Sequence, residues 1–361
     1  MLNGKKYVLG CIGTVFILLV CIAVFNLWQD PAGIFAGENP YKTMAKESCS
    51  GKKLVVSGNY DERLFTKNVI ELGDNRYDVI VLGSSRIMDI GEQDFPDEIK
   101  VRNLGVSGAA LEDDIAIWES YVTHMDALPK LVIVGIDPWL FNRHNGENRW
   151  KSLTEEYLAG MKRLGLKGDV QKDNERYRSL LSISYTKESW KKYRNPVKPL
   201  EVPLEIWNSQ EESAEDKSLI YADGSRMGSR KSYREDAEAK ARAYVRDKVY
   251  HLEKYEELDE GLRDIFSAWI KSMQKQGIKV IFFLPPYHPL VYDHLQQNIQ
   301  YKNAFEAGAW AKDFAADQGI DIIGAYNPQE MGVGKDAFID GMHMKRQYQS
   351  RYVMSFLKDK I

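Results

Sequence analysis

The chain has 361 residues, with 49 Lys or Arg against 52 Asp or Glu. This length allows one large domain or two small ones with an ample core, and an aromatic content of 11% excludes a disordered chain. The near balance of charge excludes a bulk attraction to nucleic acid, so we expect no nucleic-acid partner.

The N-terminal stretch is long and apolar enough to cross a membrane. No charged residue occurs from Tyr7 to Trp28, which matches the ~20 residues that a bilayer core requires. Two lysines precede this stretch and Asp30 follows it, so the positive-inside rule places the N-terminus in the cytoplasm. We therefore expect a cytoplasmic tail over 1–6, a single-pass anchor in the cell membrane over 7–28, and an extracytoplasmic remainder.

Two other N-terminal signals fit less well. A cleaved signal peptide has an apolar region of ~7–15 residues followed by small residues, whereas this run is longer and ends in Phe25-Asn26-Leu27-Trp28. A lipid-modified cysteine would follow the apolar run, but Cys11 precedes its core and Cys21 lies within it. Cys49 is the one cysteine beyond the span, so no disulfide is possible within the exported part.

The first half of the exported part alternates between strands and helices. Residues 29–52 are rich in Pro, Gly and polar side chains and are interpreted as a tether, and the folded domain is expected over 53–361. Apolar runs predict strands, and helical periodicity predicts helices. The strands are expected at 77–83, 100–104 and 130–135, and the helices at 64–72 and 111–125.

Residues 143–250 interrupt this alternation with a strongly charged sequence. Tyr221 to Ser225 is typical of a turn or hairpin, and 235–250 favours a helix. We interpret the region as a helical or irregular insertion that covers one end of the sheet. A solvated helical cap with no role in substrate binding fits the sequence equally well.

The alternation then resumes to the C-terminus. Helices are expected at 258–276, 304–318 and 346–358, and strands at 279–284 and 321–324. Strands that alternate with helices are the signature of a parallel sheet covered by helices. The sequence therefore predicts an α/β fold.

Polar residues follow most of the predicted strands. They are Ser84-Ser85, Ser107-Gly108, Asp137, Tyr287-His288 and the loop Asp340–His343. Ligand sites of open parallel sheets lie beyond the C-terminal ends of the strands. We therefore expect these loops to converge on one site.

Three of these stretches resemble the sequence blocks of SGNH/GDSL-type hydrolases. Gly83–Arg86 looks like their nucleophile block, with Ser85 in the nucleophile position. Asn103–Gly108 resembles the second block, whose last glycine offers a backbone N–H to the oxyanion, and Asp340–His343 is similar to the final Asp-x-x-His block. The resemblance covers about 75–140 and 278–358, and the middle of the chain is unmatched.

The resemblance implies a flavodoxin-like three-layer sandwich around a mostly parallel, five-stranded sheet. The Gly-Ser-Ser form with an N-terminal anchor is most similar to the extracytoplasmic branch that modifies cell-envelope polymers. That branch includes alginate-acetylation proteins and the D-alanyl transfer protein of teichoic-acid synthesis. No cofactor is implied.

The residues themselves specify the chemistry. His343 is the best-placed base for the Ser85 hydroxyl, and Asp340 would hold the other imidazole nitrogen. The backbone N–H groups of Ser85 and Gly108 would hold the oxyanion. An acyl-serine would form, and either water or a sugar hydroxyl would resolve it.

One position departs from the family. Its third block supplies an asparagine side chain as an oxyanion donor, whereas this chain has Asp137. Asp137 would have to be protonated, turned away, or used to bind substrate hydroxyls; Asn142 is a candidate replacement amide. Arg86 and His288 are further candidates for substrate binding, although a turn or pocket-wall role suits His288 better than that of a base.

Structural interpretations of these residues stay open. The two serines could cap a following helix, Gly108 could serve only a tight turn, and Asp340 with His343 could be an ordinary loop pair. No metal-ligand spacing is present among the remaining histidines, and we expect no metal site; they are His124, His144, His251 and His294.

Together with this resemblance, the residues lead us to expect a serine O-acyltransferase or acylesterase; the resemblance implies an acylated cell-envelope polysaccharide as substrate and a multi-span membrane acyltransferase as a possible partner. The alternative is an inactive protein of the same fold that binds glycan or supports such an acyltransferase. A lipid-acting esterase is less favoured, because the charged insertion offers no obvious acyl channel.

Overall fold

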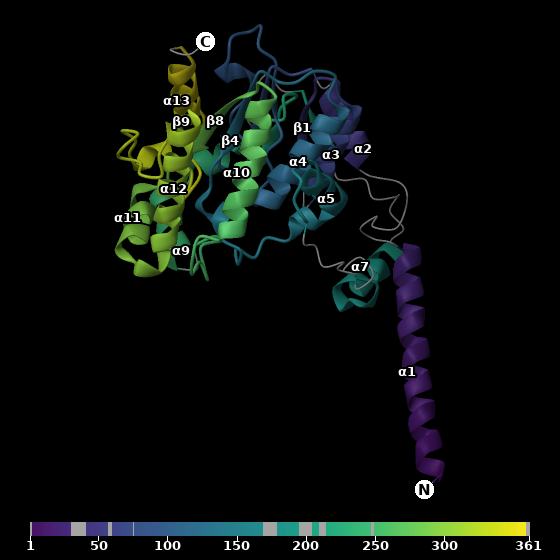
Figure 1. Ribbon diagram of the computed structural model, residues 1–361. Coiled ribbons are helices and arrows are strands. Elements are labelled where there is room, and N and C mark those ends of the chain that lie inside the picture. The colour runs from purple at the N-terminus through teal and green to yellow at the C-terminus, as the bar shows by residue number, and fades with distance from the viewer. Residues whose placement is uncertain are drawn as a thin grey trace. The chain divides into compact units, whose positions relative to one another are not determined.

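The computed structural model describes residues 2–29, 41–56, 60–74, 76–168, 179–194, 204–208, 214–246 and 249–358 (Figure 1). The chain forms two units. One comprises residues 1–42 and 169–202, and the other comprises 43–168 and 203–361.

The first unit contains the N-terminal helix α1 (Leu2–Gln29). Its part from Lys6 to Gln29 is long and apolar enough to cross a membrane, and of these residues only Asn26, near the C-terminal end, is buried. The short helices η4 (Ser179–Leu181) and α7 (Ile183–Arg194) lie beside the C-terminal end of α1 (Figure 1). The apolar helix expected from the sequence is therefore present, and its orientation across a membrane stays a prediction.

A five-stranded parallel sheet forms the centre of the second unit. Its order is β3-β2-β4-β8-β9, and every pairing between neighbours is parallel. The parallel sheet predicted from the sequence is thus confirmed. The strands are β2 (Val79–Leu82), β3 (Val101–Asn103), β4 (Leu131–Gly135), β8 (Lys279–Leu284) and β9 (Asp321–Gly324).

Helices pack on both faces of this sheet. On one face, Val353 and Leu357 of α13 (Arg346–Lys358) join a core cluster with alternate strand residues such as Val81. On the other face, Phe282 of β8 contacts Phe266 of α10 (Glu260–Lys275) and Phe314 of α12 (Lys302–Gln318). Because both faces are covered, the strands are apolar without alternation.

A second sheet was not predicted. Its order is β5-β1-β6-β7, and its pairings are antiparallel. The strands are β1 (Lys53–Val56), β5 (Leu204–Trp207), β6 (Leu219–Ile220) and β7 (Arg226–Met227). The hairpin expected at 221–225 is present between β6 and β7, but the insertion is not wholly helical or irregular, because it supplies three of these strands.

The expected tether also needs correction. Residues 41–49 form helix α2 (Tyr41–Cys49), in which Met44 and Ala45 are 1% and 0% exposed. This part packs into the fold because its apolar residues fall on one helical face. Residues 30–40 of the expected tether lie outside the described residues.

The remaining described helices lie between these elements in the chain. The bounds of the predicted helices agree with those of the observed helices to within a few residues. The α-helices are α3 (Glu62–Leu72), α4 (Leu111–His124), α5 (Thr154–Arg163), α8 (Arg230–Arg234), α9 (Ala237–Arg246) and α11 (Pro289–Gln297). Short 3-10 helices are η1 (Glu92–Asp94), η2 (Pro138–Phe141), η3 (Arg149–Leu153), η5 (Ile299–Tyr301) and η6 (Lys335–Ala337).

Candidate active site

The turn after β2 presents Ser85 at the C-terminal edge of the parallel sheet. Gly83 has a φ of 137°, and a Cβ atom there would lie 2.9 Å from the Ile87 side chain and 3.1 Å from the Gly135 backbone. Only glycine fits this turn without strain. Because β2 lies between β3 and β4, Ser85 is at the point where the strand order reverses, the usual ligand site of such sheets.

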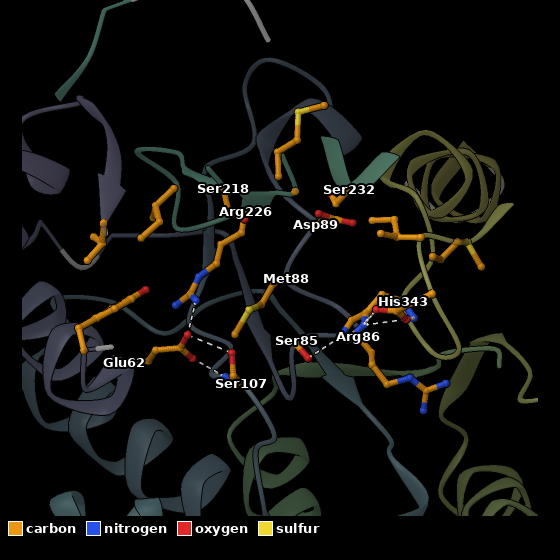
Figure 2. A pocket seen from close by; sticks show the side chains of 18 residues that line it. Glu62, Ser85, Arg86, Met88, Asp89, Ser107, Ser218, Arg226, Ser232 and His343 are labelled. Atoms are coloured by element: carbon orange, nitrogen blue, oxygen red, sulfur yellow. Dashed lines mark hydrogen bonds and ion pairs between the residues drawn. The ribbon is translucent and has the colours of Figure 1, made fainter. Parts of the chain in front are cut away.

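No helix follows Ser85, so the interpretation of the two serines as helix caps is wrong. The Ser84 hydroxyl accepts a hydrogen bond from the backbone N–H of Arg86 at 3.2 Å, which is a turn role. The Ser85 side chain instead points toward the C-terminal loop (Figure 2).

Ser85, His343 and Asp340 form one hydrogen-bonded chain. Ser85 Oγ lies 2.8 Å from His343 Nε2 (Figure 2). His343 Nδ1 lies 2.9 Å and 3.1 Å from the two carboxylate oxygens of Asp340. Ser85 and His343, 258 positions apart in the sequence, are thereby in contact. Asp340 and His343 are therefore part of a longer hydrogen-bonded chain and not only a pair within their loop.

The Asp340 carboxylate is held ionised by its surroundings. Its Oδ1 accepts hydrogen bonds from the backbone N–H groups of Met342 and His343, each at 2.9 Å. Burial raises the pKa of this carboxyl, but His343 and the two N–H donors outweigh burial and lower the pKa below its ordinary value. An ionised carboxylate in this position favours the imidazole tautomer with the proton on Nδ1, which leaves Nε2 free to accept.

Arg86 ties this loop to the ends of two neighbouring strands. Its side chain is wholly buried. Nε donates to the carbonyl of Met342 at 3.1 Å, and Nη2 donates to the carbonyls of Pro285 and Pro286 at 2.7 and 2.8 Å. The guanidinium also lies 4.0 Å from the Tyr287 ring centroid. Arg86 lines the cavity at Ser85, but these bonds leave it little capacity to bind substrate.

Asp137 completes this arrangement. Its carboxylate accepts from Nη1 of Arg86 at 2.9 Å, and its side chain is 1% exposed. Burial raises the Asp137 pKa, and Arg86 and Ser84 oppose that rise. Of the three possibilities left by the sequence, the structure favours a carboxylate turned away into an ion pair, because Asp137 does not line the cavity at Ser85.

The cavity at Ser85 has a volume of about 400 Å³. Polar and charged side chains surround Ser85 and His343 in it (Figure 2). The described residues that line it are Val56, Tyr60, Glu62, Ser85, Arg86, Met88, Asp89, Ser107, Ser218, Ile220, Arg226, Met227, Gly228, Ser232, Ile339, Asp340, His343 and Met344.

The insertion forms one wall of this cavity. The β6–β7 hairpin docks on β3, since Asn103 donates its backbone N–H to the carbonyl of Asp223 at 2.8 Å. The docking places Arg226 where its Nη1 donates to Glu62 at 2.6 Å, and Glu62 also accepts from the Ser107 hydroxyl at 3.0 Å (Figure 2). Of the two interpretations of the insertion, the structure favours the one in which it covers the end of the sheet.

Asp89 is a cavity residue that sequence reasoning missed. Burial raises the pKa of its carboxyl to about 7, and the nearby Arg346 and His343 oppose the rise. The only sequence signal for Asp89 was an acidic residue four positions after Ser85. Acidic residues are common on any protein surface, so this spacing did not mark a site residue. Glu62 and Arg226 were missed for the same reason.

The loop at Gly108 adopts a φ of 60°, and a Cβ atom there would lie 2.2 Å from the Tyr250 hydroxyl. Glycine is therefore required at this tight turn, although Gly108 does not line the cavity. In the described part of the chain, no hydrogen bond engages the backbone N–H of Gly108 or of Ser85.

Asn142 and His288 lie away from the Ser85 hydroxyl. The Asn142 amide donates to the carbonyls of His251 and Glu253 at 2.9 and 3.3 Å, so the expectation of a replacement oxyanion donor is not met. His288 caps α11, accepting from the Leu290 N–H at 3.2 Å. Its burial lowers the pKa, which makes it a neutral wall residue behind the loop at 340–343.

The comparisons with known proteins add no assignment. No protein-family model and no curated protein matches the chain. Among the residues described above, no group of three or more His, Cys, Asp or Glu side chains is placed to hold a metal ion.

Proposed function

We propose that this chain is a membrane-anchored, extracytoplasmic serine O-acyltransferase or acylesterase of the SGNH type, acting on a cell-envelope polysaccharide. The observation that carries the proposal is the hydrogen-bonded chain from Ser85 through His343 to Asp340. This chain opens on a cavity of about 400 Å³. Nucleophile, base and orienting carboxylate in that order constitute a serine triad.

In the proposed mechanism, His343 carries each proton. His343 Nε2 takes the proton from Ser85 Oγ as that oxygen attacks the ester carbonyl. The same proton then passes to the departing alkoxide, which leaves Ser85 acylated. In the second half, His343 takes a proton from water or from a sugar hydroxyl, whose oxygen attacks the acyl-serine, and returns it to Ser85.

The developing oxyanion needs donors, and two backbone groups are proposed. The N–H groups of Ser85 and Gly108 engage no other acceptor in the described residues. Ser85 lines the cavity, whereas Gly108 only follows the lining residue Ser107. Each well-aimed donor is worth about 3–4 kcal/mol in the transition state. The aspartate in place of the family's asparagine is less unfavourable than it seemed, because Arg86 neutralises Asp137.

The character of the cavity supports a hydroxyl-rich substrate. Its wall combines Ser107, Ser218, Ser232 and the Glu62–Arg226 pair with apolar side chains such as Met88 and Ile220. The polar members can form hydrogen bonds with sugar hydroxyls. A volume of about 400 Å³ lies near the lower end for small-molecule sites. A short acyl group and part of a glycan suit it better than a long lipid chain.

The competing proposal is an inactive protein that binds glycan or supports a multi-span acyltransferase. Its main support was an aspartate in the oxyanion position, and the Arg86–Asp137 ion pair offers that aspartate a structural role instead. The two proposals differ in whether Ser85 becomes acylated.

Replacement of Ser85 tests the proposed function. We expect Ser85→Ala to abolish the burst of p-nitrophenol from p-nitrophenyl acetate, while Ser84→Ala, one residue away in the same turn, retains it. Circular dichroism of both variants would check folding. A full burst from a folded Ser85→Ala variant would remove Ser85 from the mechanism, whereas a folded wild-type protein that gives no burst would favour the inactive-protein alternative.

A further inference from the structure

The C-terminal end of α1 carries a polar residue that the folded chain covers. Asn26 is 0% exposed, and its amide donates to the carbonyl of Leu180 at 2.7 Å and to the hydroxyl of Thr186 at 2.8 Å. These bonds fasten the segment 179–194 to α1. All of the residues in this attachment belong to the unit of residues 1–42 and 169–202.

Aromatic rings reinforce the attachment. The Tyr193 ring lies 6.0 Å from that of Phe25 and 6.3 Å from that of Trp28, and the Trp190 ring lies 6.2 Å from that of Phe25. Trp190 and Tyr193 nevertheless remain 54% and 52% exposed, and Trp28 is 70% exposed. Three amphipathic rings thus collect at the end of the apolar helix, as they do at membrane–water interfaces.

One largely exposed side of α7 is a stripe of alternating apolar and cationic residues. Ile183, Lys187, Trp190 and Arg194 follow one another at spacings of three or four residues, so they lie on one helical face. All four are exposed, Ile183 at 76%. The opposite side bears Ser189, which is 0% exposed, and Thr186, which bonds Asn26.

The length of α1 fixes the level of this stripe relative to a bilayer. From Tyr7 to Asn26 an α-helix rises about 29 Å, and the hydrocarbon core is about 30 Å thick. When Tyr7 lies at the inner boundary, Asn26 and the attached α7 lie at the outer one. There, indole rings and isoleucine enter the acyl boundary while lysine and arginine reach lipid phosphates.

We infer that α7 is an interfacial helix that lies in the outer headgroup layer and binds anionic phospholipid. The inference rests on the membrane anchoring that is part of the proposed function, but it does not depend on Ser85. Sequence charge supports the lipid class: α7 carries four basic residues against one acidic residue, and such helices bind anionic bilayers by apolar burial together with charge attraction.

Nitroxide accessibility in the full chain tests this inference. Labels are placed by Ile183→Cys and, as a deep reference, by Phe16→Cys, in a background with Cys11, Cys21 and Cys49 replaced by serine. The protein is reconstituted in nanodiscs of phosphatidylcholine alone or mixed with phosphatidylglycerol, and relaxation by O₂ is compared with relaxation by Ni(II)-EDDA. We expect the ratio of O₂ relaxation to Ni(II)-EDDA relaxation for the Ile183 label to lie between the ratios for the Phe16 label and for a free nitroxide in water. We expect phosphatidylglycerol to raise this ratio, which indicates a deeper label.

A charge variant tests the preference for anionic lipid separately from the interfacial position of α7. Lys187→Glu should abolish the shift caused by phosphatidylglycerol and leave the Phe16 label unchanged. An Ile183 label as water-accessible as free nitroxide in both bilayers would overturn the inference, as would protection from both reagents, which indicates a protein contact. Loss of α1 from the mass of the purified protein would also overturn it. The p-nitrophenol burst from the same samples tests Ser85 separately.

Discussion

At the scale of single residues, the proposed chemistry depends on what Asp340 does for His343. The carboxylate contacts Nδ1 through both of its oxygens and is itself held by two backbone N–H groups. It therefore fixes the imidazole ring and the tautomer that can accept the Ser85 proton.

Replacement of Asp340 by asparagine should remove this tautomer control and keep the loop geometry. We expect Asp340→Asn to lower kcat for p-nitrophenyl acetate by on the order of 10²–10⁴, with little change in KM. Asp336→Asn, an exposed acid in the same loop region, is the matched control and should retain activity. Equal activity of the two variants would remove Asp340 from the mechanism.

Asp89 makes stability depend on pH. Its folded-state pKa of about 7 is above the ordinary value of 3.8, so between these pH values the folded state binds more protons than the unfolded state. Stability from the protonated carboxyl is full below about pH 4 and is lost as pH rises through 7.

Asp89→Asn should remove that loss. In urea titrations at pH 5 and pH 8, we expect the free energy of unfolding of the variant relative to the wild type to rise by about 2–3 kcal/mol between the two pH values. A relative stability that is the same at both pH values would mean that Asp89 is ionised throughout.

At the scale of elements, Arg86 connects three segments that are far apart in the sequence: the loop that carries His343 and the ends of β4 and β8. Its guanidinium contacts the carbonyls of Met342, Pro285 and Pro286 and the carboxylate of Asp137. The loop that carries His343 is thereby fixed to the ends of β4 and β8. A lysine cannot reproduce this planar set of donors.

Arg86→Lys should therefore cost stability and activity together. We expect a loss of about 2–4 kcal/mol in the free energy of unfolding, because buried acceptors are left unpaired, and a lower kcat, because His343 is released. Arg76→Lys is the control: Arg76 pairs with Asp74 on the surface, where such pairs contribute little. An unchanged denaturation midpoint for Arg86→Lys would refute this role.

The parallel sheet was predictable because its strands are buried on both faces. Four consecutive apolar residues such as Val79 to Leu82 are typical of a core strand. The second sheet was not predictable, because β6 and β7 have two residues each and β1 pairs with strands that are distant in the sequence. Such strands exist only because tertiary contacts hold them.

The candidate site divides in the same way. Ser85, Asp340 and His343 were identified because their residue types and spacing carry a known chemistry. Glu62 and Arg226 are ordinary charged residues until the hairpin brings them together, 164 positions apart. Arg86 was noted, but its role depends on contacts with carbonyls that no sequence pattern reveals.

At the scale of the whole molecule, the apolar helix and the α/β unit are expected to have separable roles. The 18-residue apolar window of α1 has no buried residue within the unit to which α1 belongs. The residues of the triad and its cavity all belong to the unit of residues 43–168 and 203–361.

Deletion of residues 1–29 should therefore change solubility and not chemistry. We expect the shortened chain to remain in solution without detergent, because the exposed apolar surface of α1 is gone, and to keep the kcat/KM of the full chain for p-nitrophenyl acetate. A shortened chain that folds by circular dichroism but lacks activity would show that the first unit takes part in the site.

The central claim is that Ser85 is an activated nucleophile. It is tested most directly by treating the full chain with a fluorophosphonate and mapping the adduct by peptide mass spectrometry. We expect one covalent adduct, on Ser85, whose formation is lost in Asp340→Asn and His343→Ala and retained in Ser84→Ala. A folded protein that forms no adduct, or one that is modified at another serine, would contradict it.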